Sequence, residues 1–102
     1  MQKKREHVKI FTAFCDDTRI KILDMLKNGE QSAATLLLHV EVAQSTLSHH
    51  MKILEESGIV IARKAGKWTY YSICETGRQY ALDLLKRLTS LPIELIDAKS
   101  SI

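Results

Sequence analysis

The sequence predicts a mainly helical protein with one β-hairpin, in the order four helices, hairpin, helix. Apolar residues recur at helical spacing in the first half of the chain and again near its C-terminal end. Between these parts, residues 59–61 and 68–73 are rich in β-branched and aromatic side chains and flank Gly66, which is typical of two strands joined by a turn. The chain has 102 residues and is 45% hydrophobic, so we expect residues 1–102 to form a single domain with a packed core.

Two helices are expected in the first third of the chain. The first runs from about residue 4 to residue 14 and carries on its apolar side Val8, Phe11, Phe14 and Cys15. Asp16 can cap the second helix, which runs to about residue 27. The apolar residues that this second helix is expected to bury are Ile20, Leu23 and Leu26. Gly29 ends it, because glycine readily adopts the left-handed conformation that follows many helices.

A third helix and a fourth helix are expected in the middle of the chain. Ser32 can cap a helix that continues to Val40, and residues 41–43 form the following turn. The fourth helix begins after this turn and ends at Gly58. Ala43 stands where a capping hydroxyl would be expected, which costs on the order of 1 kcal/mol relative to serine.

The fourth helix has two faces of opposite character. At positions i, i+3, i+4 and i+7 one side carries Ser45, Ser48, His49 and Lys52. The residues on another side are Leu47, His50, Met51 and Leu54. We expect the second side to pack against the core, with His50 as a hydrogen-bonded structural residue. The first side carries hydroxyl, imidazole and ammonium groups, which can contact bases and phosphates.

The hairpin that follows is basic, although the net charge of the whole chain is only +3. No acidic residue lies between Glu56 and Glu75, and the cations in this interval are Arg63, Lys64 and Lys67. Such a patch attracts phosphate, whereas an isolated patch can equally be a solvated hairpin tip. A polar helix followed by a basic β-ribbon is the layout of a winged helix-turn-helix that binds double-stranded DNA. The last helix begins at residues 75–76 and carries Tyr80, Leu84, Leu88 and Leu91.

Four local sequences, in this order along the chain, resemble the ArsR/SmtB family of small bacterial transcriptional repressors. They are residues 11–23 (Phe-Thr-Ala-Phe-Cys-Asp-Asp-Thr-Arg-Ile-Lys-Ile-Leu), residues 44–54, residues 57–60 and residues 66–71. The resemblance covers nearly the whole chain and implies a homodimer that binds a near-palindromic operator and blocks transcription. It also implies that the first and last helices form the dimer interface, here through the Val8/Phe11 and Leu84/Leu88 faces.

The resemblance further implies which residues contact DNA. The matching positions are Gln44, Ser45, Thr46, Ser48 and His49 on the helix and Arg63, Lys64 and Lys67 in the wing. Lys52 joins them because it shares the polar face of the helix. Gln44 can make a two-pronged contact with adenine. The wing cations would neutralise phosphates, which positions a protein on DNA without reading its sequence.

Relatives that sense metals through thiolates carry cysteines in the third helix, at positions where this chain has Ser32 and Ala34. Neither residue supplies the thiolate that a soft-metal site requires, and Glu55 replaces a cysteine found in other relatives. A second kind of site in the family uses Asp and His on the last helix, where this chain has Asp83 and Glu94 but no histidine. We therefore expect no metal site and no cofactor. The effector stays open between thiol redox, an organic small molecule and no ligand at all.

The two cysteines, Cys15 and Cys74, lie after the first expected helix and before the last one. Because those helices should be neighbours, the two sulfur atoms could approach each other within one subunit or across two subunits. A reversible disulfide there would move the dimer helices and change DNA binding. The alternative is that both cysteines are small buried core residues, as free cysteines often are.

The sequence argues against several other classes of protein. No apolar run approaches the roughly 18 residues of a membrane span, and the N-terminus lacks a signal core, so we expect a cytoplasmic protein. A phosphate-binding glycine loop and a nucleophile elbow are both missing, so we do not expect an enzyme. The remaining alternative is a winged-helix module for protein partners, with a contact patch of Trp68, Tyr70 and Tyr71.

Overall fold

A computed structural model of the chain describes residues 2–92, with side chains from residue 6 onward. The elements are α1 (Gln2–Ala13), α2 (Asp17–Leu26), β1 (Gln31–Ser32), α3 (Ala33–Val40), α4 (Gln44–Glu56), β2 (Val60–Ala65), β3 (Trp68–Ile73) and α5 (Glu75–Leu88). The expected order of four helices, hairpin and helix is confirmed. The structure adds one short strand, β1, which the sequence did not predict.

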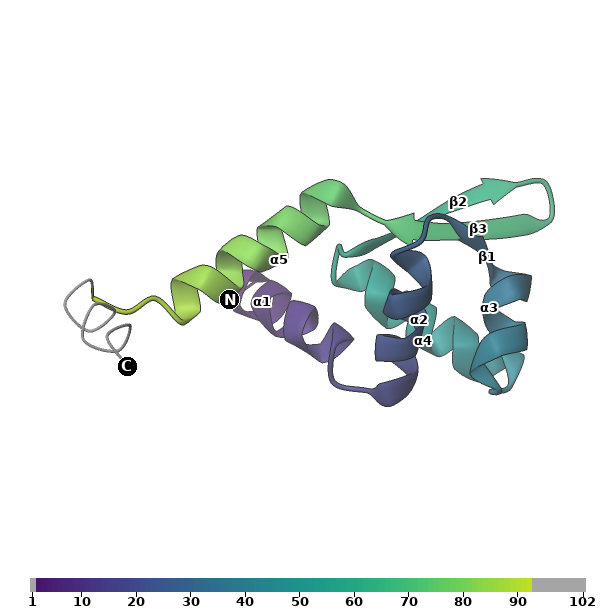
Figure 1. Ribbon diagram of the computed structural model, residues 1–102, viewed down its shortest axis with the longest axis horizontal. Helices are drawn as coiled ribbons and strands as arrows, with labels where there is room; N and C mark the ends of the chain where they lie inside the picture. The colour runs from purple at the N-terminus through teal and green to yellow at the C-terminus, as the bar shows by residue number, and fades with distance from the viewer. Residues whose placement is uncertain (1, 93–102) are drawn as a thin grey trace.

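The domain has a wing at one end and a pair of helices at the other (Figure 1). β2 and β3 form the wing, and α1 and α5 lie beside each other at the opposite end, with α2, α3 and α4 below the wing. The sheet has the strand order β1-β3-β2 and is antiparallel, with Ser32 opposite Tyr70 and Arg63 on the other side of the same tyrosine. No helix of the described residues is long and apolar enough to cross a bilayer.

Local signals in the sequence account for most helix ends. The Asp16 carboxylate accepts the backbone N–H groups of Thr18 and Arg19, and the Ser32 hydroxyl accepts that of Thr35, so both expected caps are confirmed. Ala43 caps α4 without a side-chain bond, as expected. The helix itself ends two residues before Gly58, which has a φ of +83°.

The core lies where α2, α3, α4 and the base of the wing meet. Its fully buried large side chains are Ile22, Leu26, Leu36, Met51, Leu54, Val60 and Leu84. The prediction for α2 was wrong at Ile20, which is 46% exposed, because the helix turns Arg19, Ile22 and Leu26 inward instead. Hydropathy alone cannot place an arginine inside, and this arginine is accommodated by hydrogen bonds described below.

The terminal helices agree with the expectation only in part. On α1 the buried residues are Ile10 and Ala13, and the apolar side with Val8, Phe11 and Phe14 is exposed in the single chain, which leaves Val8 and Phe11 available for the predicted dimer interface. On α5, Leu84 is only 1% exposed and packs into the core of its own chain, so its predicted place in a dimer interface was wrong. The other apolar residues predicted on this helix and just after it, Tyr80, Leu88 and Leu91, are exposed.

Candidate nucleic-acid interface

The two faces of α4 lie as the sequence predicted. Its buried residues are Leu47, His50, Met51 and Leu54. Every residue predicted to contact DNA from this helix is exposed, namely Gln44, Ser45, Thr46, Ser48, His49 and Lys52. The helix is therefore anchored along one side and offers amide, hydroxyl, imidazole and ammonium groups along the other. These groups can pair with base edges and phosphate oxygens in a DNA groove.

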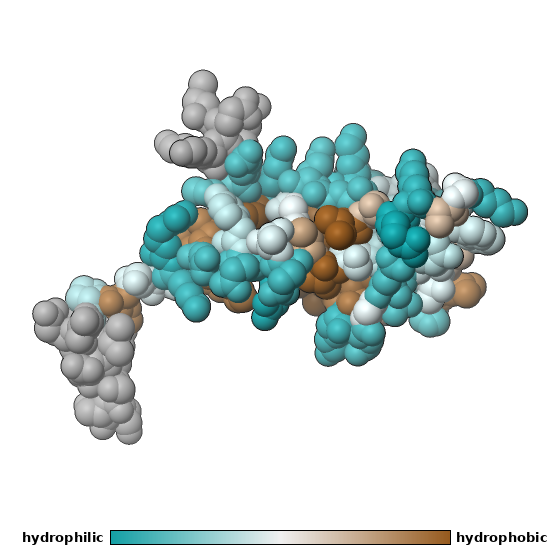
Figure 2. Space-filling model, turned by 90° about the horizontal axis from the view of Figure 1, so that it is seen from above, coloured by the Kyte–Doolittle hydropathy of each residue, from teal (hydrophilic) through white to brown (hydrophobic). Residues whose placement is uncertain are grey.

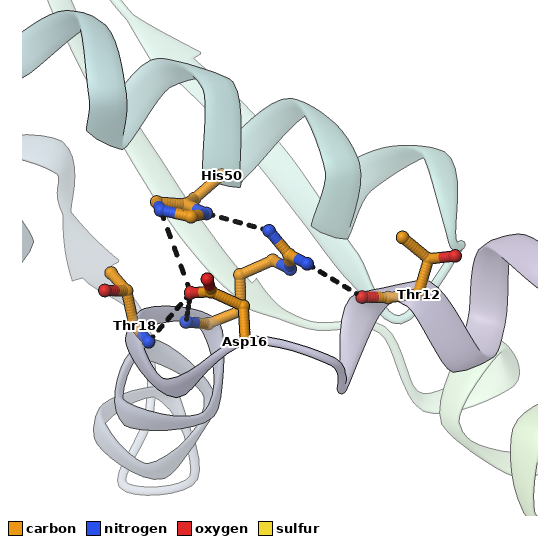
Figure 3. A network of polar contacts seen from close by, with 5 residues as sticks. Thr12, Asp16, Thr18 and His50 are labelled. Atoms are coloured by element: carbon orange, nitrogen blue, oxygen red, sulfur yellow. Dashed lines mark hydrogen bonds and ion pairs between the residues drawn. The ribbon is translucent and has the colours of Figure 1, made fainter.

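A partly buried polar cluster attaches α4 to the corner between α1 and α2 (Figure 3). Arg19 has one guanidinium nitrogen 2.9 Å from His50 Nδ1, and another donates to the Thr12 carbonyl at 3.0 Å. Since a guanidinium cannot accept a hydrogen bond, His50 Nδ1 is the acceptor, and the ring carries its proton on Nε2. That nitrogen lies 3.8 Å from the Asp16 carboxylate. The prediction that His50 is a hydrogen-bonded structural residue is confirmed.

Asp16 is the acidic member of this cluster, which consists of Thr12, Asp16, Arg19 and His50. The backbone N–H of Arg19, together with that of Thr18 and the nearby charges, holds the pKa of the Asp16 carboxyl below its ordinary value. The aspartate is therefore ionised at neutral pH, where it caps α2 and faces the two nitrogen-bearing side chains.

The wing turns through Gly66 and Lys67, and Gly66 has a φ of +62°, a conformation that favours glycine. Lys64 and Lys67 are exposed, and the Lys67 ammonium lies 5.5 Å from the centre of the Trp68 ring. Both lysines are free to approach a phosphate without breaking an ion pair with any described residue.

Arg63 is different from the two lysines, because its guanidinium already has a partner. Nε donates to Glu30 at 3.0 Å and a terminal nitrogen donates to the same carboxylate at 2.7 Å, while the group stacks 4.6 Å from the centre of the Tyr70 ring. These bonds lower the pKa of Glu30 and raise the pKa of Arg63. A phosphate that binds Nε or this terminal nitrogen would have to replace Glu30. Sequence reasoning missed Glu30, because nothing local connects two residues 33 positions apart.

The first half of α4 and the tip of the wing lie beside each other. Both border one hollow of about 290 Å³, to which the helix contributes Gln44 and Ser48 and the wing contributes Lys67 and Trp68. The floor of the hollow comes from α3 and from buried apolar side chains of α4. The fold thus brings helix residues and wing residues, which are far apart in the sequence, to one surface.

The cysteines do not meet within the chain. Both are free thiols: Cys15 donates to the Phe11 carbonyl at 3.1 Å, and Cys74 Sγ lies 3.3 Å from the Thr76 hydroxyl. Figure 1 shows the end of α1 and the start of α5 well apart, so the expected approach within one subunit was wrong. The helices are neighbours along other parts of their lengths. An approach across two subunits stays a prediction.

Cys74 sits at the N-cap position of α5. Hydrogen bonds from the Thr76 hydroxyl and then from the Gly77 backbone lower the pKa of its thiol. The buried alternative does not describe Cys15, which is exposed, or Cys74, which is half-buried.

Two of the positions that hold metal ligands in relatives make hydrogen bonds within this chain. Ser32 caps α3, and Asp83 accepts a hydrogen bond from Gln79. Among the described residues, no group of three or more His, Cys, Asp and Glu side chains could hold an ion. Glu94 lies outside the described residues.

A second exposed surface is apolar and lies on the two terminal helices. We call it the α1–α5 face and define it by Phe11, Phe14, Leu82, Leu85 and Leu88, all exposed. Its centre is a hollow of about 360 Å³ between the helices. Viewed from above, hydrophobic surface gathers over α5 and where the hairpin passes into it, between hydrophilic side chains (Figure 2). Exposed apolar surface of this kind commonly marks an interface.

Comparison with known proteins gives consistent results. The sequence profile described as bacterial regulatory protein, arsR family, matches residues 16–62. An uncharacterized HTH-type transcriptional regulator of Methanocaldococcus jannaschii is 38% identical over 96 residues, covering 93% of this chain and 100% of the relative. The transcriptional repressor SdpR of Bacillus subtilis is 34% identical over 74 residues, covering 72% of this chain and 82% of the repressor. The structure of HlyU from Vibrio cholerae superposes with a TM-score of 0.67 at 30% identity, covering 87% and 97% of the two chains.

Proposed function

The chain belongs to the arsR family of bacterial transcriptional regulators, and from this premise we propose that it is a repressor whose homodimer binds a near-palindromic operator. The carrying observation is that the polar side of α4 is fully exposed and shares one hollow with the tip of the wing. In winged helix-turn-helix proteins such a helix enters the major groove, and the wing follows the neighbouring phosphates.

We assign the contacts by chemistry. Gln44 pairs with an adenine edge, and Ser45 and Ser48 donate to bases or phosphates. His49, Thr46 and Lys52 extend the same exposed surface. Lys64 and Lys67 neutralise phosphates, and Arg63 contributes less than either lysine while its guanidinium stays bound to Glu30.

The α1–α5 face supports the homodimer. A two-fold axis through this face would bury its exposed leucines and phenylalanines against the same residues of a second copy. Reading two half-sites then requires the two copies of α4 to lie about 34 Å apart, the distance between successive major grooves. The test is the molar mass in solution: we expect a dimer for the wild type and a monomer for Leu85→Asp. A monomeric wild type would contradict the dimer.

For the effector we propose thiol oxidation that joins subunits. A peroxide-class oxidant would take two electrons and two protons from two thiols and leave one disulfide and water. Cys74 is the expected starting point, because the lowered pKa of its thiol enlarges the thiolate fraction. Cys15 of the other subunit is its expected partner.

The function is tested by selecting duplexes from a random library with purified protein and measuring affinity at several salt concentrations. Repression predicts a selected two-fold symmetric site and a steep loss of affinity with salt. With six phosphate contacts the affinity would fall by roughly a thousandfold between 50 and 200 mM salt. A flat salt dependence with no selected site would contradict DNA binding and favour a module that binds protein partners.

A further inference from the structure

Two polar residues of the cluster in Figure 3, Arg19 and His50, are buried and lie away from the proposed DNA-binding surface. Arg19 is 7% exposed and His50 is 8% exposed. Burying a charged guanidinium is costly, and apolar residues of similar volume often give equal or better stability at such a place. The cluster is therefore poorly explained by stability alone, and its geometry indicates what else it does.

Arg19 lies on α2 and connects two other helices, α1 and α4. One terminal nitrogen binds the last turn of α1 at the Thr12 carbonyl, and the other binds His50 in the middle of α4. The planar guanidinium fixes the angle between these two bonds. Arg19 itself is held at the first turn of α2, where its backbone N–H donates to Asp16. The side chain thus links the corner between α1 and α2 to the inner side of α4.

We propose that Arg19 and His50 are positioning residues for DNA binding, which set the placement of α4 without touching DNA. This rests on the proposed function of α4. His50 follows directly on Ser48 and His49, whose side chains are exposed on the outer side. A shift of the helix at His50 therefore moves these two side chains relative to a base edge. Since hydrogen bonds to bases tolerate only a few tenths of an ångström, small shifts reduce specific affinity.

The link is also sensitive to the acceptor on His50. Only a neutral imidazole can accept a hydrogen bond from Arg19. The guanidinium has little to replace this bond, because its buried Nε already has no partner among the described residues. A proton on Nδ1 would face the guanidinium at 2.9 Å and break the link.

The experiment compares two substitutions at one position. In His50→Asn the side-chain oxygen replaces Nδ1 as acceptor, whereas His50→Leu removes the acceptor. We expect His50→Leu to lose about tenfold or more in affinity for the selected duplex, at unchanged affinity for a scrambled duplex. His50→Asn should stay within about threefold of the wild type. Equal affinity of all three proteins, or a failure of His50→Asn to restore binding, overturns the proposal.

A matched control separates positioning from stability. Ile22→Val removes one methyl group from a fully buried side chain of α2, outside the cluster, and typically costs about 0.5–1.5 kcal/mol of stability. We expect it to lower the melting temperature and leave specific affinity unchanged. The same loss of specific affinity in Ile22→Val would contradict a positioning role.

A second measurement serves if His50→Leu does not fold. In Arg19→Lys the ammonium keeps the charge but cannot hold the Thr12 carbonyl and His50 Nδ1 at the angle that the planar guanidinium fixes, so specific affinity should fall by about tenfold at unchanged affinity for a scrambled duplex. Specific affinity equal to that of the wild type contradicts the proposal. If the wild type binds no duplex at all, the proposed function fails; if wild type and variants bind equally, only this inference fails.

Discussion

Replacing the two free lysines of the wing should remove a defined share of the salt dependence of DNA binding. Lys64 and Lys67 are exposed, and no acidic group of the described residues pairs with either. Two lysines in each of two subunits give four ammonium groups. Each neutralised phosphate contributes about 0.9 to the slope of log affinity against log salt, so the double variant to glutamine should lose about 3.6 units of slope.

The assay is fluorescence anisotropy of the selected duplex between 50 and 200 mM salt. Over this fourfold range, a slope difference of about 3.6 makes the wild type lose roughly 150-fold more affinity than the double variant. Lys86→Gln on α5 is the matched control, which removes the same charge away from α4 and the wing and should change the slope by less than about one unit.

Arg63→Gln should behave differently from the lysine variants. The guanidinium is held by two hydrogen bonds to Glu30, so we expect its removal to lower the slope by less than about one unit. A drop of about 1.8 would show that Arg63 leaves Glu30 when DNA binds.

An unchanged slope in the double lysine variant would refute the assignment of the wing as a phosphate-binding element.

Three further outcomes follow from single positions. In Gly77→Ala the new methyl group would clash with the Gly58 carbonyl oxygen, so α5 must shift. We expect a loss of about 1–3 kcal/mol, seen as a lower melting temperature, and an unchanged melting temperature would contradict this packing. The lowered pKa of Asp16 means that the unfolded chain binds the proton more readily, so the stability that this carboxylate contributes is present above about pH 4 and is lost below it. In acid denaturation, Asp16→Asn should therefore lose less stability than the wild type between about pH 5 and about pH 2. Equal losses of stability would contradict the role of this cap. Hydrogen peroxide should produce a disulfide-linked dimer on a non-reducing gel that Cys74→Ser abolishes, whereas persistence in this variant would exclude Cys74 as the redox site.

The parts of the fold predicted from sequence are those fixed by local chemistry. Asp16 and Ser32 cap their helices through backbone groups two or three residues away, and Gly66 supplies the positive φ of the hairpin turn. The two faces of α4 follow from helical spacing, because a strongly polar side and an apolar side alternate cleanly there.

The parts that were missed depend on contacts between distant segments. Arg19 points inward because a carbonyl of α1 and an imidazole of α4 receive its donors, which no pattern within α2 reveals. The bond between Glu30 and Arg63 joins segments 33 residues apart. On α5, helical spacing places Leu84 and Leu88 on one face, but Leu84 is buried in the core of its own chain and Leu88 is exposed.

The central claim is that the outer side of α4 reads DNA sequence, and Gln44 tests it most directly. The measurement is the ratio of affinities for the selected duplex and for duplexes changed at each single base pair, at one fixed salt concentration, for wild type and Gln44→Ala. We predict that the variant loses discrimination at one base pair in each half-site, by about 1–3 kcal/mol, and keeps it elsewhere. Unchanged discrimination at every position, with the same affinity, would contradict direct reading by this helix.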